Sequence, residues 1–329
     1  MTLKDVAALA GVSVSTVSRV INNNVPVEPE TKRKVEAAIQ KLGYRPNLLA
    51  KGLRAGSGAM IGLIVPMTAH PTFSLFSQYI CDYCSKKGYN LVIGSHHNNP
   101  DIEEFLIDSF SRRNIDGLII SLVSDESRAL SMIHNHPIPT VIIDRVVNKE
   151  RHKSVIVDNY LAGKLMAEHF VSLGHKKVGC ITGPMSINLA RERLQGFRDA
   201  LSEHGITLNE RFVIEEAFEF EAGIAAAKKM LRNKNDLPTA IWAHSDDIAA
   251  GVLKYANLIG LEVPHDLSLA GMDDNQLAKV LAPSLTTIAQ PIRQMSEIAV
   301  DIIINKSAND SYTVFEPTLC IRESTAKLS

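Results

Sequence analysis

The feature that most constrains the fold is an alternation of short apolar runs and helical patterns, which continues from residue 59 to the end of the chain. The runs are "MIGLIVP", "NLVIGS", "IDGLIIS", "PTVIID", "KKVGCITG", "PTAIWAHS", "DLSLAGMD" and "TTIAQP". Each has the length of a strand, and the segments between them have apolar residues at helical spacing. Strands that are almost continuously apolar are typical of parallel sheets covered by helices on both faces. We therefore expect an α/β body over residues 59–329.

The same alternation predicts how this body is divided. Helices are expected at about 73–87, 101–113, 126–135, 160–173, 189–204, 221–233, 246–259 and 291–305. The strand–helix pattern starts again after "VDNYLAG", which indicates two similar parallel-sheet subdomains with a cleft between them. Ligands of such sheets bind beyond the carboxyl ends of the strands. The side chains at those ends are therefore the first candidates for a binding site.

Polar residues stand at several of these strand ends. They are Asp144 in "VIIDR", Asp158 in "VIVDN", Ser245 and Asp246 in "IWAHSDD", and Asp273 in "LAGMDD". The stretch "ITGPMSINLARERLQGF" adds Asn188, Arg191 and Arg193, and "AFEFEAG" adds Phe218. Each aspartate alone also suits a helix N-cap. Together, carboxylates, a guanidinium and an aromatic ring around one cleft suit a ligand that carries many hydroxyl groups.

The first 22 residues have a different pattern. Apolar residues at Leu3, Val6, Ala7 and Ala10 form one face of a first helix, and Gly11 ends it. Ser13 suits the N-cap of a second helix, whose Val17, Val20 and Ile21 face inward. Two short helices joined by a tight turn are typical of a helix-turn-helix, in which the second helix lies in the major groove of DNA.

The outward face of the second helix is small and polar, with one arginine. Its residues are Val14, Ser15, Thr16, Ser18, Arg19 and Asn22. Small side chains let the helix approach base edges, hydroxyls can contact bases or phosphates, and arginine can donate two hydrogen bonds to guanine. An ordinary helical hairpin with a polar face would have the same residue pattern.

The next segment extends this DNA-binding interpretation. "ETKRKVEAAIQKLG" has a third apolar stripe, and Lys32, Arg33 and Lys34 are available for phosphate contact. "RPNLLAKGLRAGSG" is basic and too short to hold a helix by itself. It predicts a hinge that folds on DNA, with a leucine inserted in the minor groove. Residues 1–58 hold nine Lys/Arg and four Asp/Glu, whereas the remainder holds 26 and 32. A basic head on an acidic body is typical of a nucleic-acid-binding module.

Residues 2–58 resemble the lactose/galactose-repressor (LacI/GalR) family of bacterial transcription regulators, through "TLKDVAALAGVSVSTVSRVINN", "ETKRKVEAAIQKLGYRPN" and "LLAKGLRAGS". The resemblance implies that Val14, Ser15 and Arg19 read bases and that Leu53 is the intercalating hinge leucine. Gly52 departs from the polar residue usual in the family. The implied domains are a helix-turn-helix over 1–45, a hinge over 46–58 and a two-lobed effector-binding and dimerisation body over 59–329.

The body resembles the periplasmic-binding-protein-like effector domain of the same family, through motifs such as "NIDGLII", "ARERLQGF" and "VPHDLSLAGMDD". The implied effector contacts are Phe73, Asp144, Asn188, Arg193, Phe218, Asp246, Asp273 and Gln290. Two departures concern the ligand. "HPTFSLF" replaces the commoner Asn-Pro-aromatic pattern, and Ser245 stands where asparagine is usual, so we expect an amide hydrogen bond of the family to be missing or water-mediated.

The resulting expectation is a cytoplasmic homodimeric repressor that binds a pseudo-palindromic operator and responds to a sugar-like effector. No catalytic constellation is present, and no enzyme activity, cofactor or metal site is expected, since "CDYC" at 81–84 has no second cysteine pair. No signal peptide or membrane span is expected. The alternatives are a purine- or nucleoside-responsive repressor and a regulator whose co-effector is a phosphocarrier protein. The sequence does not identify the effector, whether it induces or co-represses, the operator sequence, or whether the protein is a dimer or a tetramer.

Overall fold

A computed structural model describes residues 1–22, 26–44, 58–113, 115–135, 138–145, 153–233, 236–305 and 312–328. The chain divides into two compact units, Met1–Gly58 and Ala59–Ser329. The expected hinge with Leu53 lies outside the described residues, apart from Gly58, and so does the side chain of Asn22. Among the described helices, none combines the length and the apolar character needed to cross a lipid bilayer.

The first unit contains the three predicted helices, α1 (Leu3–Ala10), α2 (Val14–Asn22) and α3 (Pro29–Leu42). Gly11 ends α1 in the left-handed region at φ 66°, a conformation that glycine adopts without steric cost. The Ser13 hydroxyl accepts a hydrogen bond from the Thr16 backbone N–H at 3.1 Å, which confirms Ser13 as the cap of α2. A small core of Val6, Ala7, Val17, Val35 and Ala38 holds the helices together.

The second unit contains two sheets, each with six strands in the described part of the chain. The first has the order β11 (Tyr312–Phe315), β5 (Lys153–Val157), β4 (Thr140–Ile143), β3 (Gly117–Ile120), β1 (Met60–Val65) and β2 (Asn90–Ser95). The second has the order β12 (Thr318–Cys320), β10 (Thr286–Ala289), β9 (Ser268–Asp273), β8 (Ala240–Ala243), β6 (Val178–Thr182) and β7 (Val213–Glu215). All neighbouring strands are parallel except β10 and β12. This confirms the predicted pair of parallel-sheet subdomains.

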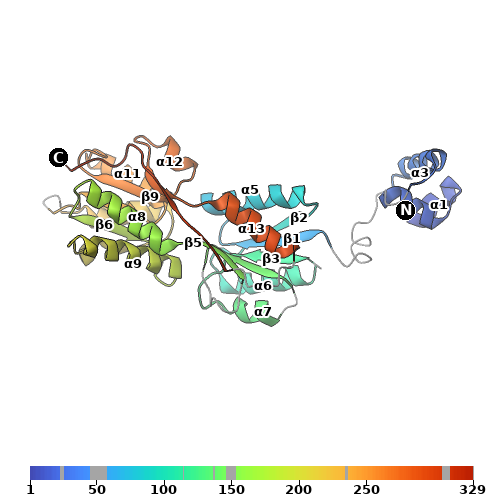
Figure 1. The fold of residues 1–329 in the computed structure, drawn as a ribbon, viewed down its shortest axis with the longest axis horizontal. Coiled ribbons are helices and arrows are strands. Elements are labelled where there is room, and N and C mark those ends of the chain that lie inside the picture. The colour runs from blue at the N-terminus through green and yellow to red at the C-terminus, as the bar shows by residue number, and fades with distance from the viewer. Residues whose placement is uncertain are drawn as a thin grey trace. The chain divides into compact units, whose positions relative to one another are not determined.

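Helices cover both faces of each sheet, which explains why the strands are apolar on both sides (Figure 1). The first sheet packs between α5 (Pro71–Lys86) with α13 (Ile292–Ile304) and α6 (Pro100–Ser111) with α7 (Ala129–Asn135). The second packs between α8 (Asn159–Ser172) with α9 (Asn188–Glu203) and α10 (Phe220–Met230) with α11 (Asp246–Leu258). A short η1 (Glu210–Phe212) precedes β7, and α12 (Gln276–Val280) follows β9.

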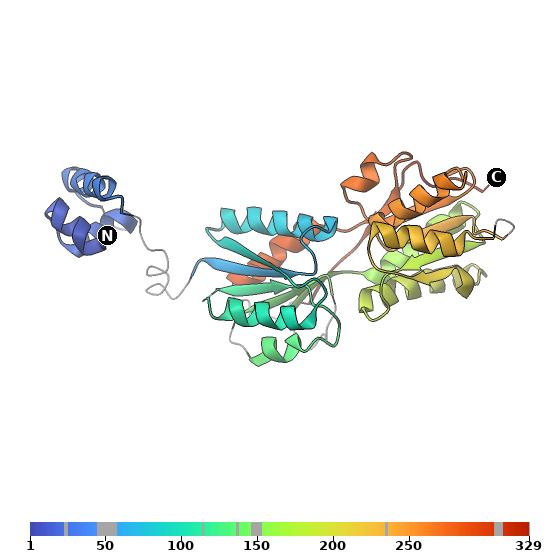
Figure 2. The same cartoon turned by 180° about the vertical axis from the view of Figure 1, so that it is seen from behind.

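The chain passes between the two subdomains three times, because its C-terminal part returns to the first sheet. The passages follow β5, β10 and β11, so that α13 and β11 join the first subdomain and β12 ends in the second (Figure 2). The sequence pattern alone did not reveal this return, nor the strands β7, β11 and β12. In proteins whose two lobes close around a ligand, the connections between the lobes form the hinge.

Candidate functional site

The outward face of α2 is the first candidate surface. Ser15, Arg19 and Val14 are exposed, and the Val14 side chain is 41% exposed although it is apolar. Thr16 and Ser18 are half-buried, whereas Val17 lies in the core. The predicted outward position is therefore confirmed for Val14, Ser15 and Arg19, and the inward position for Val17. Contact of this face with bases stays a prediction.

The basic residues of α3 are mostly engaged within their own helix. Lys34 Nζ lies 2.8 Å from Glu30 and Lys32 Nζ lies 3.9 Å from Glu36. Both pairs are exposed and one helical turn apart, so solvent screens them and each adds little to the stability of the helix. Arg33 is exposed as well. Such weak pairs exchange readily for phosphate, so the expected role of this segment stays open to test.

The second candidate site is a cavity of about 340 Å³ in the second unit, at the carboxyl ends of strands from both sheets. Six of the eight predicted effector residues lie on its wall: Phe73, Asp144, Arg193, Phe218, Asp273 and Gln290. Apolar side chains such as Ile187, Leu189 and Met67 form much of the remaining wall. A concave site of this volume, mostly apolar with a few converging polar groups, is typical of a small-molecule pocket.

Arg193 is the central cation of the second subdomain's wall. Its side chain is buried, with Nε donating to Asn159 Oδ1 at 2.8 Å and one terminal nitrogen donating to the His244 carbonyl oxygen at 2.9 Å. Burial lowers the pKa of this guanidinium, and the charges of Asp273 and Asp144 oppose that shift. The two hydrogen bonds fix the guanidinium beside both carboxylates.

Asp273 and Gln290 stand together at the ends of β9 and β10. Gln290 Nε2 donates to Asp273 Oδ1 at 2.7 Å. Burial raises the pKa of Asp273 to about 6, against the charge of Arg193, which lowers it. Asp273 also has a φ of 116° in the sparsely populated region for a side-chain-bearing residue. Its buried charge and unusual backbone are both costly to the fold, which favours a functional role for this residue.

The first subdomain contributes Asp144 and Arg145 after β4. Asp144 is buried with a φ of 68°, and burial raises its pKa while Arg145 and Arg193 lower it. Arg145 donates to the Val123 carbonyl oxygen. The pattern "VIIDR" placed Asp144 correctly at the strand end, and Arg145, which follows it directly, was missed.

Several polar atoms on the cavity wall have no hydrogen-bond partner among the described residues. They are both ring nitrogens of His70, Thr72 Oγ1, Arg145 Nε, His244 Nδ1 and Gln290 Oε1. Buried polar atoms without partners cost about 1–3 kcal/mol each, so their gathering around one cavity is what an empty ligand site would show. The sequence pattern did not predict a site role for His70, Thr72 or His244. The first two lie in "HPTFSLF" and the third in "IWAHSDD", both of which were considered.

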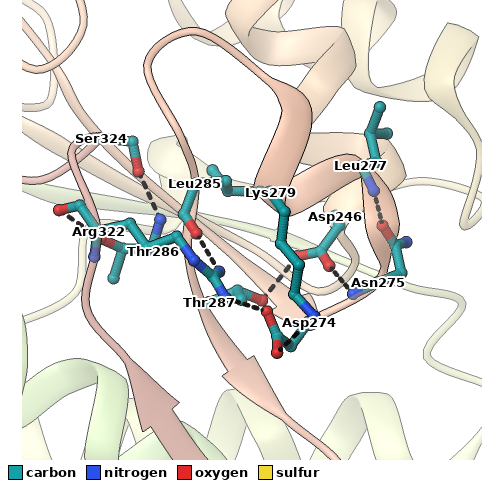
Figure 3. Close-up of polar contacts among 10 residues, drawn as sticks. All are labelled: Asp246, Asp274, Asn275, Leu277, Lys279, Leu285, Thr286, Thr287, Arg322 and Ser324. Carbon is teal, nitrogen blue, oxygen red and sulfur yellow. Dashed lines mark hydrogen bonds and ion pairs between the residues drawn. The ribbon is translucent and has the colours of Figure 1, made fainter.

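Asn188 and Asp246 are absent from the cavity wall, which corrects their predicted placement. Asn188 bonds along its own helix, with Nδ2 donating to Glu192 at 2.7 Å. Ser245 caps α11 by accepting from the Ile248 N–H at 3.1 Å, and Asp246 turns into the sheet. There its carboxylate accepts from Thr287 Oγ1 at 2.6 Å and from the Asn275 N–H at 2.9 Å (Figure 3). Asp246 therefore links β10 to the segment that follows β9 by hydrogen bonds and does not face the cavity.

Residues near the C-terminus of the chain also contact the loop that follows Asp273. Asp274 forms an ion pair with Arg322, which also donates to the Leu285 carbonyl oxygen at 2.7 Å (Figure 3). Lys279 Nζ lies 3.6 Å from the same carboxylate. Arg322 follows β12, which comes directly after the third connection between the subdomains. Its bonds therefore tie this C-terminal segment to the loop that follows Asp273.

Comparison with known proteins gives a match for each of the two units. A family model described as bacterial regulatory proteins, lacI family, matches residues 2–47, and a periplasmic-binding-protein-like domain matches residues 167–325. The ribose operon repressor of Haemophilus influenzae is 35% identical, over 98% of this chain and 98% of the relative. The HTH-type transcriptional repressor PurR of Photobacterium profundum is 33% identical, over 100% of this chain and 99% of the relative.

Solved structures agree with these relatives. The Lac repressor dimer bound to operator and the anti-inducer ONPF has a TM-score of 0.89 at 28% identity, over 99% of each chain. A complex of the regulator CelR with cellobiose has a TM-score of 0.75 at 29% identity, over 98% of this chain and 99% of that chain. With its helix-turn-helix and its two-lobed body, the chain belongs to the lacI family of DNA-binding bacterial transcription regulators.

Proposed function

We propose that this protein represses a carbohydrate-utilisation operon and that a small sugar bound between its two subdomains controls its affinity for the operator. The observation that carries this proposal is the set of unpartnered polar atoms around the cavity, beside the buried Asp144, Asp273 and Arg193. Carboxylates accept hydrogen bonds from hydroxyls, and a guanidinium donates them. A polyhydroxylated ligand satisfies both kinds of group at once.

The shape of the cavity and the relatives support a sugar. Phe73 and Phe218 supply ring faces on the wall, and the volume of about 340 Å³ lies near the lower end of ligand pockets, roughly 300–1,000 Å³. One relative is named as a ribose operon repressor. The relatives named PurR make a purine or nucleoside effector the second candidate. A phosphocarrier partner is disfavoured because, among the charged residues of α5, only Lys86 is basic.

In this proposal two chains pair through their bodies and place both copies of α2 in successive major grooves of a pseudo-palindromic operator in the cytoplasm. Residues 46–58 form the hinge, with Leu53 in the minor groove between half-sites. The body regulates and does not catalyse a reaction. Binding of the sugar changes the angle between the subdomains, and by linkage the operator changes sugar affinity by the same factor.

Thermal unfolding against separate sets of neutral sugars and purines tests the effector class. A ligand present at about 100 times its Kd stabilises the protein by about 2.7 kcal/mol, a readily measured shift. We expect at least one sugar to raise the unfolding temperature and the Arg193→Met variant to lose that response. A shift with hypoxanthine or guanine alone would support the purine alternative. Absence of any shift with both sets would contradict a small-molecule effector of either class.

A further inference from the structure

We propose that the cavity selects an electrically neutral sugar and excludes phosphorylated sugars and other anions. This inference rests on the proposed sugar-responsive function and adds the charge of the ligand. It follows from the partners of each guanidinium near the cavity, from the surplus of carboxylates on its wall and from unpartnered groups on that wall that suit hydroxyls.

Arg193 has little positive charge left for an anion. Two of its nitrogens donate to the oxygens of Asn159 and His244. Asp273 and Asp144 both act on it through their charges, and each is buried in the same wall. The charge of this guanidinium is therefore already partly compensated by two buried carboxylates.

The other two arginines near the cavity are compensated as well. Arg145 donates to the Val123 carbonyl oxygen, and the carboxylates of Asp144, Asp125 and Glu103 act on its charge. Its Nε has no acceptor among the described residues, so this N–H can donate to a ligand oxygen. Arg191 spans the subdomains, with one terminal nitrogen 2.7 Å from Asp125 Oδ2 and the other donating to the Met185 carbonyl oxygen at 2.7 Å.

Carboxylates outnumber the guanidinium groups on the wall. Asp144, Asp273 and Glu219 line the cavity against Arg145 and Arg193. Asp246 lies behind the wall, and burial together with the charge of Asp273 raises its pKa well above the ordinary value. A phosphate monoester carries about −1.5 to −2 charges at pH 7. Desolvating that charge beside buried carboxylates is unfavourable unless a cation compensates it, and the two guanidinium groups on the wall are already opposed by three carboxylates.

The unpartnered groups suit hydroxyls instead. Thr72 Oγ1 can donate and accept, Gln290 Oε1 accepts, and a neutral imidazole offers one donor and one acceptor. Burial and the charge of Arg193 hold the pKa of His244 well below its usual range, so this ring is neutral. A sugar hydroxyl can both donate and accept, and it therefore matches each of these groups without bringing a charge.

Matched pairs of ligands test this inference on the full-length protein by calorimetry and thermal unfolding. The pairs are D-ribose with D-ribose 5-phosphate, D-glucose with D-glucose 6-phosphate, and D-fructose with D-fructose 6-phosphate, and inorganic phosphate serves as the anion alone. We expect the neutral member of the responsive pair to bind at least about tenfold tighter, since like charges brought together at a binding site disfavour the complex. Tighter binding of any phosphate ester would overturn the inference and leave the sugar-responsive function standing. Binding of purines alone would overturn both.

A charge variant separates electrostatic from steric exclusion. Asp144→Asn keeps the size of the side chain and tolerates the positive φ, since asparagine is enriched there. We expect this variant to reduce the neutral-to-phosphate affinity ratio by about tenfold, equivalent to about 1.4 kcal/mol. Glu221→Gln removes an exposed carboxylate that does not line the cavity and should leave the ratio unchanged. An unchanged ratio in a folded Asp144→Asn variant would show that shape excludes the phosphate, and the charge argument would be wrong.

Discussion

Replacing Asp273 with asparagine should make the ligand-free protein more stable while weakening effector binding. Asp273 is buried, and burial raises its pKa to about 6 although Arg193 lies nearby. Asparagine has the same shape, is tolerated at positive φ and still offers an oxygen to Gln290 Nε2. The variant therefore removes the buried charge and leaves the local geometry in place.

The shift in the pKa of Asp273 gives the size of the gain in stability. The difference between the ordinary value of 3.8 and about 6 is roughly two units, and each unit equals about 1.36 kcal/mol. A carboxyl whose pKa is raised on folding stabilises the native state below pH 3.8, and this contribution is lost as the pH rises through 6. Asp273→Asn should therefore gain about 3 kcal/mol over wild type at pH 8 and about half as much at pH 5.

Urea unfolding at pH 5 and pH 8 measures this gain. Trp242 is the single tryptophan of the chain and is buried in the second subdomain, so its fluorescence reports the unfolding of the lobe that holds Asp273. Groups distant from Asp273 are shared between the two proteins, so their effects cancel in the difference, whereas the pKa values of Asp246 and Arg193 depend on the charge of Asp273 and contribute to the measured gain. We predict that the buried charge of Asp273 destabilises the ligand-free protein. This prediction would be refuted by a variant that is no more stable than wild type at pH 8, or by a gain that is the same at both pH values.

Three further variants test other parts of the structure. Arg19→Ala should weaken specific operator binding by about 1–3 kcal/mol and leave binding to random DNA nearly unchanged; equal losses on both DNAs in a gel shift would argue against base reading. Ser13→Ala removes the cap on Thr16 and should lower the stability of the head by about 1 kcal/mol in thermal denaturation, whereas an unchanged midpoint would show that the cap is dispensable. Gly163→Ala would overlap the backbone carbonyl of Arg193, so it should cost about 1–3 kcal/mol and weaken sugar binding in calorimetry; wild-type affinity would show that α8 and α9 adjust without moving the guanidinium.

Local patterns predicted the head and the strand ends well because each depends on neighbouring residues. The cap at Ser13, the turn at Gly11 and the apolar stripe through Val17 are set within a few positions of the chain. Asp144 and Asp273 also follow from strand ends alone, since parallel strands bring their carboxyl ends to one edge.

What the sequence did not reveal depends on partners that are distant along the chain. Nothing near α13 indicates that it packs on the first sheet, because an amphipathic helix fits either lobe. Asp246 follows a strand as Asp273 does, yet it turns beneath the wall because Thr287 and the Asn275 N–H lie there. The roles of His70 and His244 become visible only when both lobes surround one cavity.

The central claim is that a sugar in the cavity controls the affinity for DNA. Fluorescence anisotropy with labelled operator, with and without a saturating amount of the sugar that raises the unfolding temperature, measures this control directly. The account predicts a change in operator Kd of roughly 5- to 150-fold, in the range of typical coupling energies, and no change in Arg193→Met. An operator Kd that is the same with and without that sugar in the wild-type protein would contradict it.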